Sequence, residues 1–213
     1  MHRALCAIGM LVLAGCAGGP AKAPLRYQAD SAQCVASVEA LDALPIPRAG
    51  KREEAWPAPR DFQQAAGCLR SADGQPVPLL LFAVDGEPQE VQLEFLMRGQ
   101  SAFAAAIDLL DRDRRRVRTI AFAELVRRGG SYSGTIFLNP DDSHVRFLAL
   151  RPDPQAVGAS DASVVGMRNT TAGVFVASGV VYGFSITTGS EVLMRTWLSE
   201  VGEFRVRSLA LAH

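Results

Sequence analysis

From residue 79 to its end, the chain is a series of short apolar segments separated by turn residues. Within residues 91–98, apolar side chains alternate with Gln, Glu and Arg, which is the period of a half-buried β-strand. The other segments of this kind are 79–84, 103–110, 117–122, 134–138, 145–150, 172–177, 180–187, 192–198 and 204–211. Because no helical segments of ten or more residues alternate with them, the pattern predicts a mainly β domain, an antiparallel β-sandwich over residues 73–213.

Glycine marks the turns between the last predicted strands. The three turn signals are Ser178-Gly179, Thr188-Gly189-Ser190 and Val201-Gly202. Residues 151–169 contain Pro, Gly, Ala and Ser throughout, so we expect an irregular connection there.

Residues 30–72 predict a small N-terminal segment, partly helical and partly extended. Asp30 or Ser31 can cap a helix, and the apolar residues that follow at a helical spacing are Val35, Val38, Leu41 and Leu44. Pro45 and Pro47 end this predicted α-helix, because proline lacks the N–H that a helix interior needs. A proline-rich, extended connection follows.

The first residues predict export. A positive start at His2-Arg3 precedes an apolar run, Ala4–Ala14, which is shorter than the roughly 20 residues of a transmembrane helix. Leu13-Ala14-Gly15-Cys16 is a bacterial lipobox, so residues 1–15 form a lipoprotein signal peptide and Cys16 receives lipid. The alternative is an ordinary signal peptide that ends by chance at a cysteine. Residues 16–29, rich in Gly, Ala and Pro, predict a flexible tether.

This N-terminus predicts a periplasmic protein that is anchored to a membrane through its lipid. Ala17 follows the cysteine in place of the aspartate that retains lipoproteins in the inner membrane, which favours the outer membrane. Of the other cysteines, Cys6 leaves with the signal peptide. Cys34 and Cys68 remain as an even pair in an oxidising compartment and predict a disulfide, with two separately buried thiols as the alternative. No histidine lies near either of them in the sequence, and we expect neither a metal site nor a cofactor.

The composition and the few histidines argue against nucleic-acid binding and nucleophilic catalysis. Lys+Arg and Asp+Glu are equal at 22 each, so no overall positive charge attracts nucleic acid. After removal of His2, only His144, in a polar turn, and the terminal His213 remain, and there is no G-x-S-x-G motif. The acidic cluster Asp108, Asp111 and Asp113 predicts turn chemistry, with a calcium site as the alternative and catalysis as a third interpretation.

Two groups of side chains are candidates for ligand contact. Arginines 112, 114, 115, 116 and 118, with 127 and 128, form a basic patch that suits anionic polymers or lipid phosphates, or else a solvated hairpin. Among the aromatic residues, Tyr132 lies beside several glycines and is the ring that we expect to be exposed. Tyr132 and Trp56 are therefore the candidate stacking residues for an oligosaccharide, with burial in the core as the alternative for each.

The order of several segments resembles that of a known family. These segments are residues 33–38, 101–111, 116–118 and 148–152. Over residues 30–190 the chain resembles the maltose operon periplasmic protein family (MalM-like proteins). The resemblance implies an early cysteine-containing helix and a β-sandwich of the pre-peptidase C-terminal type. It also implies a non-enzymatic accessory or binding module in carbohydrate transport, and no catalytic residues.

The alternative function is a structural or scaffolding lipoprotein that docks onto an envelope complex, because open sheet edges invite strand addition. The expected partners are thus the membrane through the lipid anchor, and either an oligosaccharide or an envelope protein, with no nucleic acid. An enzyme that uses Asp108 and Asp111 is the third hypothesis.

Overall fold

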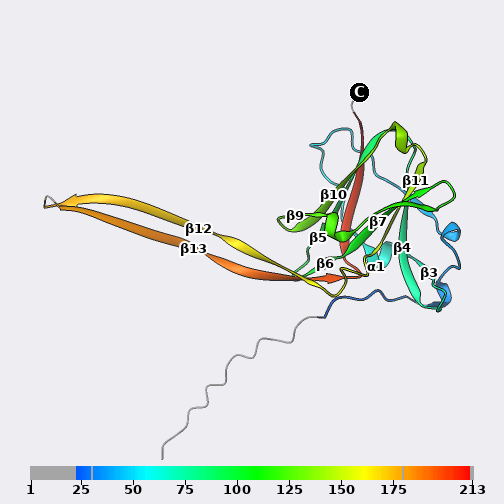
Figure 1. The fold of residues 1–213 in the computed structure, drawn as a ribbon, viewed down its shortest axis with the longest axis horizontal. Helices are drawn as coiled ribbons and strands as arrows, with labels where there is room; N and C mark the ends of the chain where they lie inside the picture. Colours follow the sequence, from blue (N-terminus) through cyan, green and yellow to red (C-terminus); the bar gives the residue numbers. More distant parts are fainter. Residues whose placement is uncertain (1–22, 30, 179, 212–213) are drawn as a thin grey trace, which may run out of the picture.

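The computed structural model describes residues 23–29, 31–178 and 180–211, and it is mainly β (Figure 1). The signal peptide and the lipobox cysteine lie outside the described residues. Helical structure in the described part is short. It comprises α1 (Phe62–Ala65) and the 3-10 turns η1 (Ser31–Gln33), η2 (Val38–Ala40), η3 (Phe122–Glu124) and η4 (Pro140–Asp142).

Two of the three sheets in the described part form the body of the molecule. The first sheet has the order β1-β4-β11-β7-β8, and β3 also pairs with β4. Its strands are β1 (Ala43–Pro45), β3 (Gly67–Arg70), β4 (Pro76–Ala83), β7 (Ala105–Asp111), β8 (Arg116–Ile120) and β11 (Val145–Pro152). These strands pair antiparallel, except that β1 runs parallel to β4.

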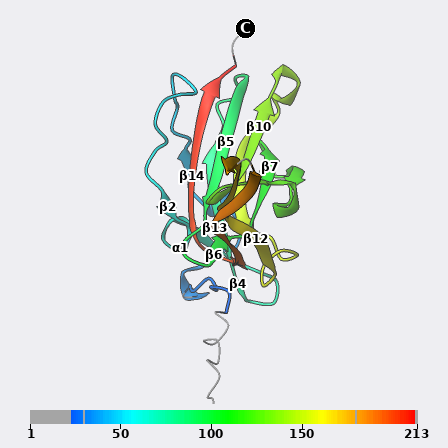
Figure 2. The same cartoon turned by 90° about the vertical axis from the view of Figure 1, so that its left-hand side faces the viewer.

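The second sheet has the order β2-β14-β5-β10-β9, and all of its pairs are antiparallel. Its strands are β2 (Arg60–Asp61), β5 (Gln89–Leu96), β9 (Val126–Arg128), β10 (Ser131–Leu138) and β14 (Glu203–Ala210). Figure 2 shows β14, β5 and β10 side by side. The alternating pattern at residues 91–98 therefore falls on β5, which is the central strand of this sheet.

One hydrophobic core lies between these two sheets. Its largest fully buried side chains are Phe62, Phe82, Phe95, Phe103 and Phe204. The rings of Phe62 and Phe103 stack with their centroids 4.2 Å apart, and Phe82 contacts Phe204 edge to face at 6.2 Å. Each buried phenylalanine contributes roughly 1.5–3 kcal/mol to folding, so this cluster is a major part of what holds the two sheets together.

The N-terminal segment covers the outer face of the first sheet. Leu79 and Leu81 of β4 point away from the main core and pack against Val38, Leu41 and Ala43. The predicted α-helix over residues 30–44 is wrong: this stretch forms two 3-10 turns and then joins the sheet as β1. Its apolar residues pack against β4 instead of forming one helical face, and tertiary contacts here outweigh the local helical period.

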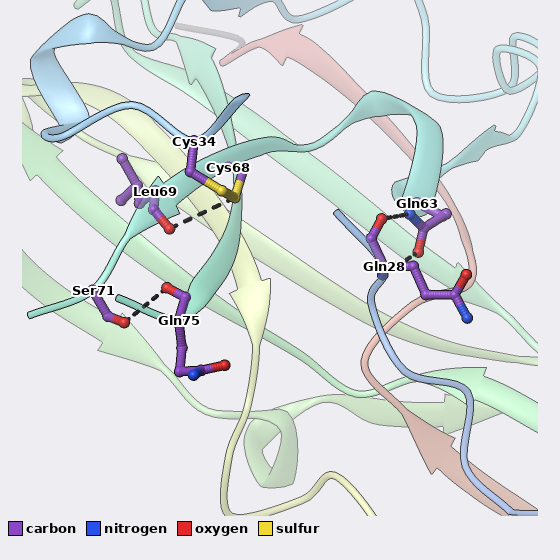
Figure 3. The surroundings of a disulfide bond; sticks show 7 residues. All are labelled: Gln28, Cys34, Gln63, Cys68, Leu69, Ser71 and Gln75. Atoms are coloured by element: carbon purple, nitrogen blue, oxygen red, sulfur yellow. Dashed lines mark hydrogen bonds between the residues drawn. A yellow bond between two sulfur atoms is a disulfide. The ribbon is translucent and has the colours of Figure 1, made fainter. Parts of the chain in front are cut away.

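A disulfide joins this N-terminal segment to β3, as the sequence predicts. Cys34 and Cys68 are bonded (Figure 3). The backbone N–H of Val35 donates to the carbonyl of Cys68 at 2.9 Å. On the other side of Figure 3, the side chain of Gln63 pairs with the backbone of Gln28, donating at 2.6 Å and accepting at 3.1 Å. The first part of the described chain is thus attached at two points, Gln28 and Cys34.

The third sheet differs most from what the sequence predicts. It contains β6 (Ser101–Phe103), β12 (Ser160–Ala177) and β13 (Val180–Ser199) in the order β12-β13-β6. β12 and β13 pair along their length and form a two-stranded ribbon that projects from one side of the body (Figure 1). We call this ribbon, residues 160–199, the arm.

Two predictions about the arm are wrong. The connection expected at residues 151–169 is irregular only up to Ala159, and β12 begins at Ser160. Thr188-Gly189-Ser190 is not a turn, because Gly189 adopts a φ of +97° within β13 and pairs with Arg168. The predicted turn signal Ser178-Gly179 falls between the end of β12 and the start of β13, and Gly179 lies outside the described residues.

Candidate functional site

The arm is the part of the described chain that exposes the most apolar surface. Most of the exposed large hydrophobic side chains lie on it, and they are Val164, Val174, Val181, Phe184, Ile186, Leu193 and Met194. Val174 retains 74% of its surface exposed and Val181 retains 67%. A monomeric protein rarely exposes a contiguous apolar surface of this kind, and where it does, the surface usually serves binding.

Beyond Asp161 at its base, the register of the arm places its charges on one face. Residues directly opposite each other in an antiparallel pair share a face, and Ala162 pairs with Arg195, Gly166 with Glu191 and Arg168 with Gly189. Arg168, Glu191 and Arg195 therefore occupy one face, which we call the charged face. The alternate positions between residues 162 and 195 hold no Asp, Glu, Lys or Arg, and they form the uncharged face.

Charge also divides the arm along its length. Residues 169–190 contain no charged residue, so the distal half of the arm is uncharged on both faces. Its residue types are mostly Val, Ile, Phe, Tyr and Thr, which favour strands, together with Gly and Ser. On the charged face of this half, the hydroxyls of Thr170 and Thr187 lie 3.1 Å apart across the ribbon.

Both edges of the arm are open in the described structure. β12 pairs with β13 and with no other described strand, and β13 pairs further only over Trp197–Ser199 with β6. The outward N–H and C=O groups along the rest of both strands thus form two unpaired edges. Such edges are templates for pairing with another chain.

Three side chains hold the base of the arm against the second sheet. The Tyr132 hydroxyl donates to Asp161 Oδ2 at 2.7 Å, and Arg127 Nη1 lies 2.8 Å from the same oxygen. The Arg127 guanidinium also lies over the Tyr132 ring, 5.7 Å from its centroid. The Tyr132 hydrogen bond is the main cause that lowers the pKa of Asp161, and burial together with that bond raises the pKa of Tyr132.

Residues 25–28, which the sequence assigned to a flexible tether, are bound to the body at this same base and beside it. Leu25 N–H donates to Ser199 Oγ at 2.9 Å, and the Leu25 carbonyl accepts from Glu200 N–H at 2.9 Å. Arg26 forms an ion pair with Glu200 at 2.5 Å. The chain therefore enters the body beside the point where β13 ends, at the base of the arm.

Neither of the predicted stacking residues is an open platform. The prediction that Tyr132 is exposed is wrong: the ring is 4% exposed, packs on Phe122 at 4.7 Å and uses its hydroxyl to hold the arm. Trp56 lies in the loop that covers the second sheet, with the guanidinium of Arg207 4.2 Å and that of Arg205 5.0 Å from its ring centroid. Both arginines come from β14, two residues apart, so Trp56 packs on their guanidinium groups and is half-buried.

The acidic cluster and the basic patch are divided among separate structural contacts. Asp108 is buried and pairs with Arg151 at 2.7 Å, whereas Asp111 accepts the Arg115 backbone N–H at 2.8 Å within a turn. Arg114 donates to the carbonyls of Val38 and Leu41. Within the described ranges, no group of three or more His, Cys, Asp or Glu side chains is placed to hold a metal ion.

No protein-family model, curated protein or solved structure matches the chain. Among the described residues, no helix is long and apolar enough to cross a bilayer. Sequence reasoning missed the arm, although its charge-free run of residues 169–190 is visible in the sequence.

Proposed function

We propose that this chain is a non-enzymatic structural lipoprotein of the bacterial cell envelope, whose arm docks it into a larger assembly. The observation that carries the proposal is the arm, with exposed apolar side chains on both faces and two unpaired edges. At about 3.3 Å per residue, its 18 paired positions extend about 60 Å. A ribbon of that reach places a binding surface far from the body.

The lipid anchor proposed at Cys16 agrees with the position of the arm. Leu25, which is bound at the arm base, comes nine residues after Cys16. Fully extended, this stretch reaches about 30 Å, so the base lies within about 30 Å of the membrane that holds the acyl chains. The exported, oxidising location also accounts for the Cys34–Cys68 disulfide.

We also propose that the body of the molecule, without the arm, is related to the maltose operon periplasmic protein family. Two sheets that share one core suit a β-sandwich of the pre-peptidase C-terminal type. A carbohydrate role receives no support from Tyr132 and Trp56, because the first is buried and the second is half-buried and already stacked on arginines. The scaffolding function is therefore the one that we favour.

Crosslinking in cells tests the proposal. A photoreactive amino acid at Val174, on the arm, is compared with the same residue at Val117, an exposed valine on β8 of the body. We expect adducts of higher mass from position 174 and few or none from position 117. Equal yields from both positions, or no adducts at all, would refute a docking arm. Incorporation of labelled palmitate that is lost in Cys16→Ser tests the anchor.

A further inference from the structure

We infer that the distal half of the arm inserts into a lipid bilayer, with its open edges paired to the arms of other copies of this chain. The inference rests on the proposed function and names the partners of the arm as lipid and a second copy. Its observations are the uncharged stretch at residues 169–190, the alternation of side chains on β13 and the two unpaired edges.

The length of the uncharged half matches a bilayer. Asn169–Ala177 on β12 is nine residues, or about 30 Å at 3.3 Å per residue. The hydrocarbon core of a bilayer is about 30 Å thick, and a membrane-spanning strand needs about 9–11 residues. Arg168 and Glu191, the nearest charges on either strand, then lie at the headgroup level rather than in hydrocarbon.

Side chains on β13 alternate as they do in membrane-spanning strands. Phe184 and Ile186 lie on the uncharged face, whereas Ser185 and Thr187 lie on the charged face. A Cβ placed on Gly173 would lie 2.6 Å from the Phe184 ring, so this ring covers its cross-strand partner. The uncharged face of β13 therefore suits lipid. The other face carries the hydroxyls of Ser185 and Thr187, with the exposed Val174 and Val181 nearer the tip of the arm.

The unpaired edges require other copies. In hydrocarbon, each unsatisfied N–H or C=O costs several kcal/mol, so a lone two-stranded ribbon is not stable there. The arm carries open edges on both β12 and β13. When β12 of one copy pairs with β13 of the next, identical arms satisfy both edges and close into a ring, and no other chain is needed.

The proximal part of the arm spans the distance between the body and the membrane. Ser160–Arg168 is nine residues, about 30 Å at 3.3 Å per residue. The proposed anchor chain from Cys16 to Leu25 has the same reach and starts at the same base. The acyl chains and the uncharged half of the arm can therefore enter one bilayer.

The test uses the full-length lipidated protein in vesicles of phosphatidylethanolamine and phosphatidylglycerol. Single cysteines at positions 184–187 carry an environment-sensitive dye, because Cys34 and Cys68 are bonded and Cys16 is acylated. We expect lipid-borne quenchers to act on positions 184 and 186, and iodide in water to act on 185 and 187. The acyl chains alone bind the protein to vesicles, so vesicle binding does not test the arm. The diagnostic readout is the alternation between lipid and iodide quenching at neighbouring positions.

A matched pair of arginine variants tests the faces. Ile186→Arg places a charge toward lipid, and Thr187→Arg places one on the adjacent residue of the other face. We expect Ile186→Arg to lower the rate of dye release from loaded vesicles at least about tenfold, and Thr187→Arg to preserve release. An aqueous dye signal at all four positions, or equal behaviour of the two variants, would overturn the inference.

The same samples separate this inference from the proposed function. If the arm stays in water but crosslinks to a different envelope protein at position 174, the membrane inference fails and the docking function stands. If the arm neither enters lipid nor crosslinks, both fail.

Discussion

The hydroxyl of Tyr132 donates a 2.7 Å hydrogen bond to the carboxylate of Asp161 and so joins the second sheet to the first residues of the arm. Tyr132 is held on β10 by packing against Phe122, and Asp161 is the second residue of β12. Arg127 binds the same carboxylate oxygen. These three side chains set the direction in which the arm leaves the body.

Tyr132→Phe removes this hydrogen bond and keeps the ring. We expect a loss of about 1–2 kcal/mol of stability, at the low end for a bond to a charged group because Asp161 is 38% exposed. Urea unfolding measures the loss, and hydrogen exchange locates it, with faster exchange at residues 196–198. If exchange changes across the whole body instead, the bond does not act at the arm base.

The junction is expected to weaken at both ends of the pH range. The folded state lowers the pKa of Asp161, so its contribution is present above the ordinary value of about 4 and is lost as pH falls through the folded pKa. The folded state raises the pKa of Tyr132, so that contribution is present below about pH 10 and is lost at higher pH.

Asp161→Asn tests the acid limb by unfolding measured between pH 3 and 7. We expect the wild type to lose its advantage over this variant as the pH falls below about 4. Asp113→Asn, at an exposed turn residue, is the matched control and should leave the pH profile unchanged. A constant difference between wild type and Asp161→Asn would show that Asp161 does not titrate with folding.

Replacing both cysteines of the disulfide tests how the N-terminal segment is held. Cys34 and Cys68 are separated by 34 residues, and a crosslink of that span stabilises by about 3–4 kcal/mol on the chain-entropy estimate. Cys34→Ser/Cys68→Ser should lose about that much in urea unfolding. Hydrogen exchange should accelerate first around Val35 and Arg70, whose backbones pair beside the bond. Unchanged stability would mean that packing on β4 suffices.

The Trp56–Arg207 pair is expected to contribute to stability rather than to sugar binding. Arg207 is 4% exposed and donates to Gln92 Oε1 at 2.8 Å and to the carbonyls of Arg52 and Glu54. Arg207→Met leaves these acceptors unpaired and should cost about 2–4 kcal/mol, whereas Trp56→Phe should cost less. Calorimetry with maltodextrins should show no heat of binding for the wild type. Binding that Trp56→Ala removes would contradict this interpretation.

Deleting the arm should leave the body folded. Neither hydrophobic core cluster contains a residue between 163 and 194, so replacing that stretch by a short turn removes no described core side chain. We expect the melting temperature to change by only a few degrees and the crosslinked adducts to disappear. A large fall in melting temperature would show that the arm is part of the folding unit.

Local patterns predicted what depends on neighbouring residues. The alternation that starts at residue 91 falls on β5, the Ser178-Gly179 signal falls between the ends of β12 and β13, and the cysteine pair is bonded. Each of these is decided by backbone preference, by strand period or by the compartment that the N-terminus predicts. The mainly β class follows from the same signals.

The remaining features were decided by contacts between residues far apart in the chain. Residues 30–44 have a helical spacing, but burial against β4 makes them turns and a strand. Thr188-Gly189-Ser190 has the composition of a turn, but Gly189 pairs with Arg168, and the pairing of β12 with β13 continues through it. The sequence by itself determined that the chain is mainly β with one crosslinked pair of cysteines. Only the tertiary structure decided that Tyr132 is buried and that β12 and β13 extend beyond the body. Whether a ring is covered, and whether a hairpin packs on the rest of a sheet, depends on segments that are distant in the chain.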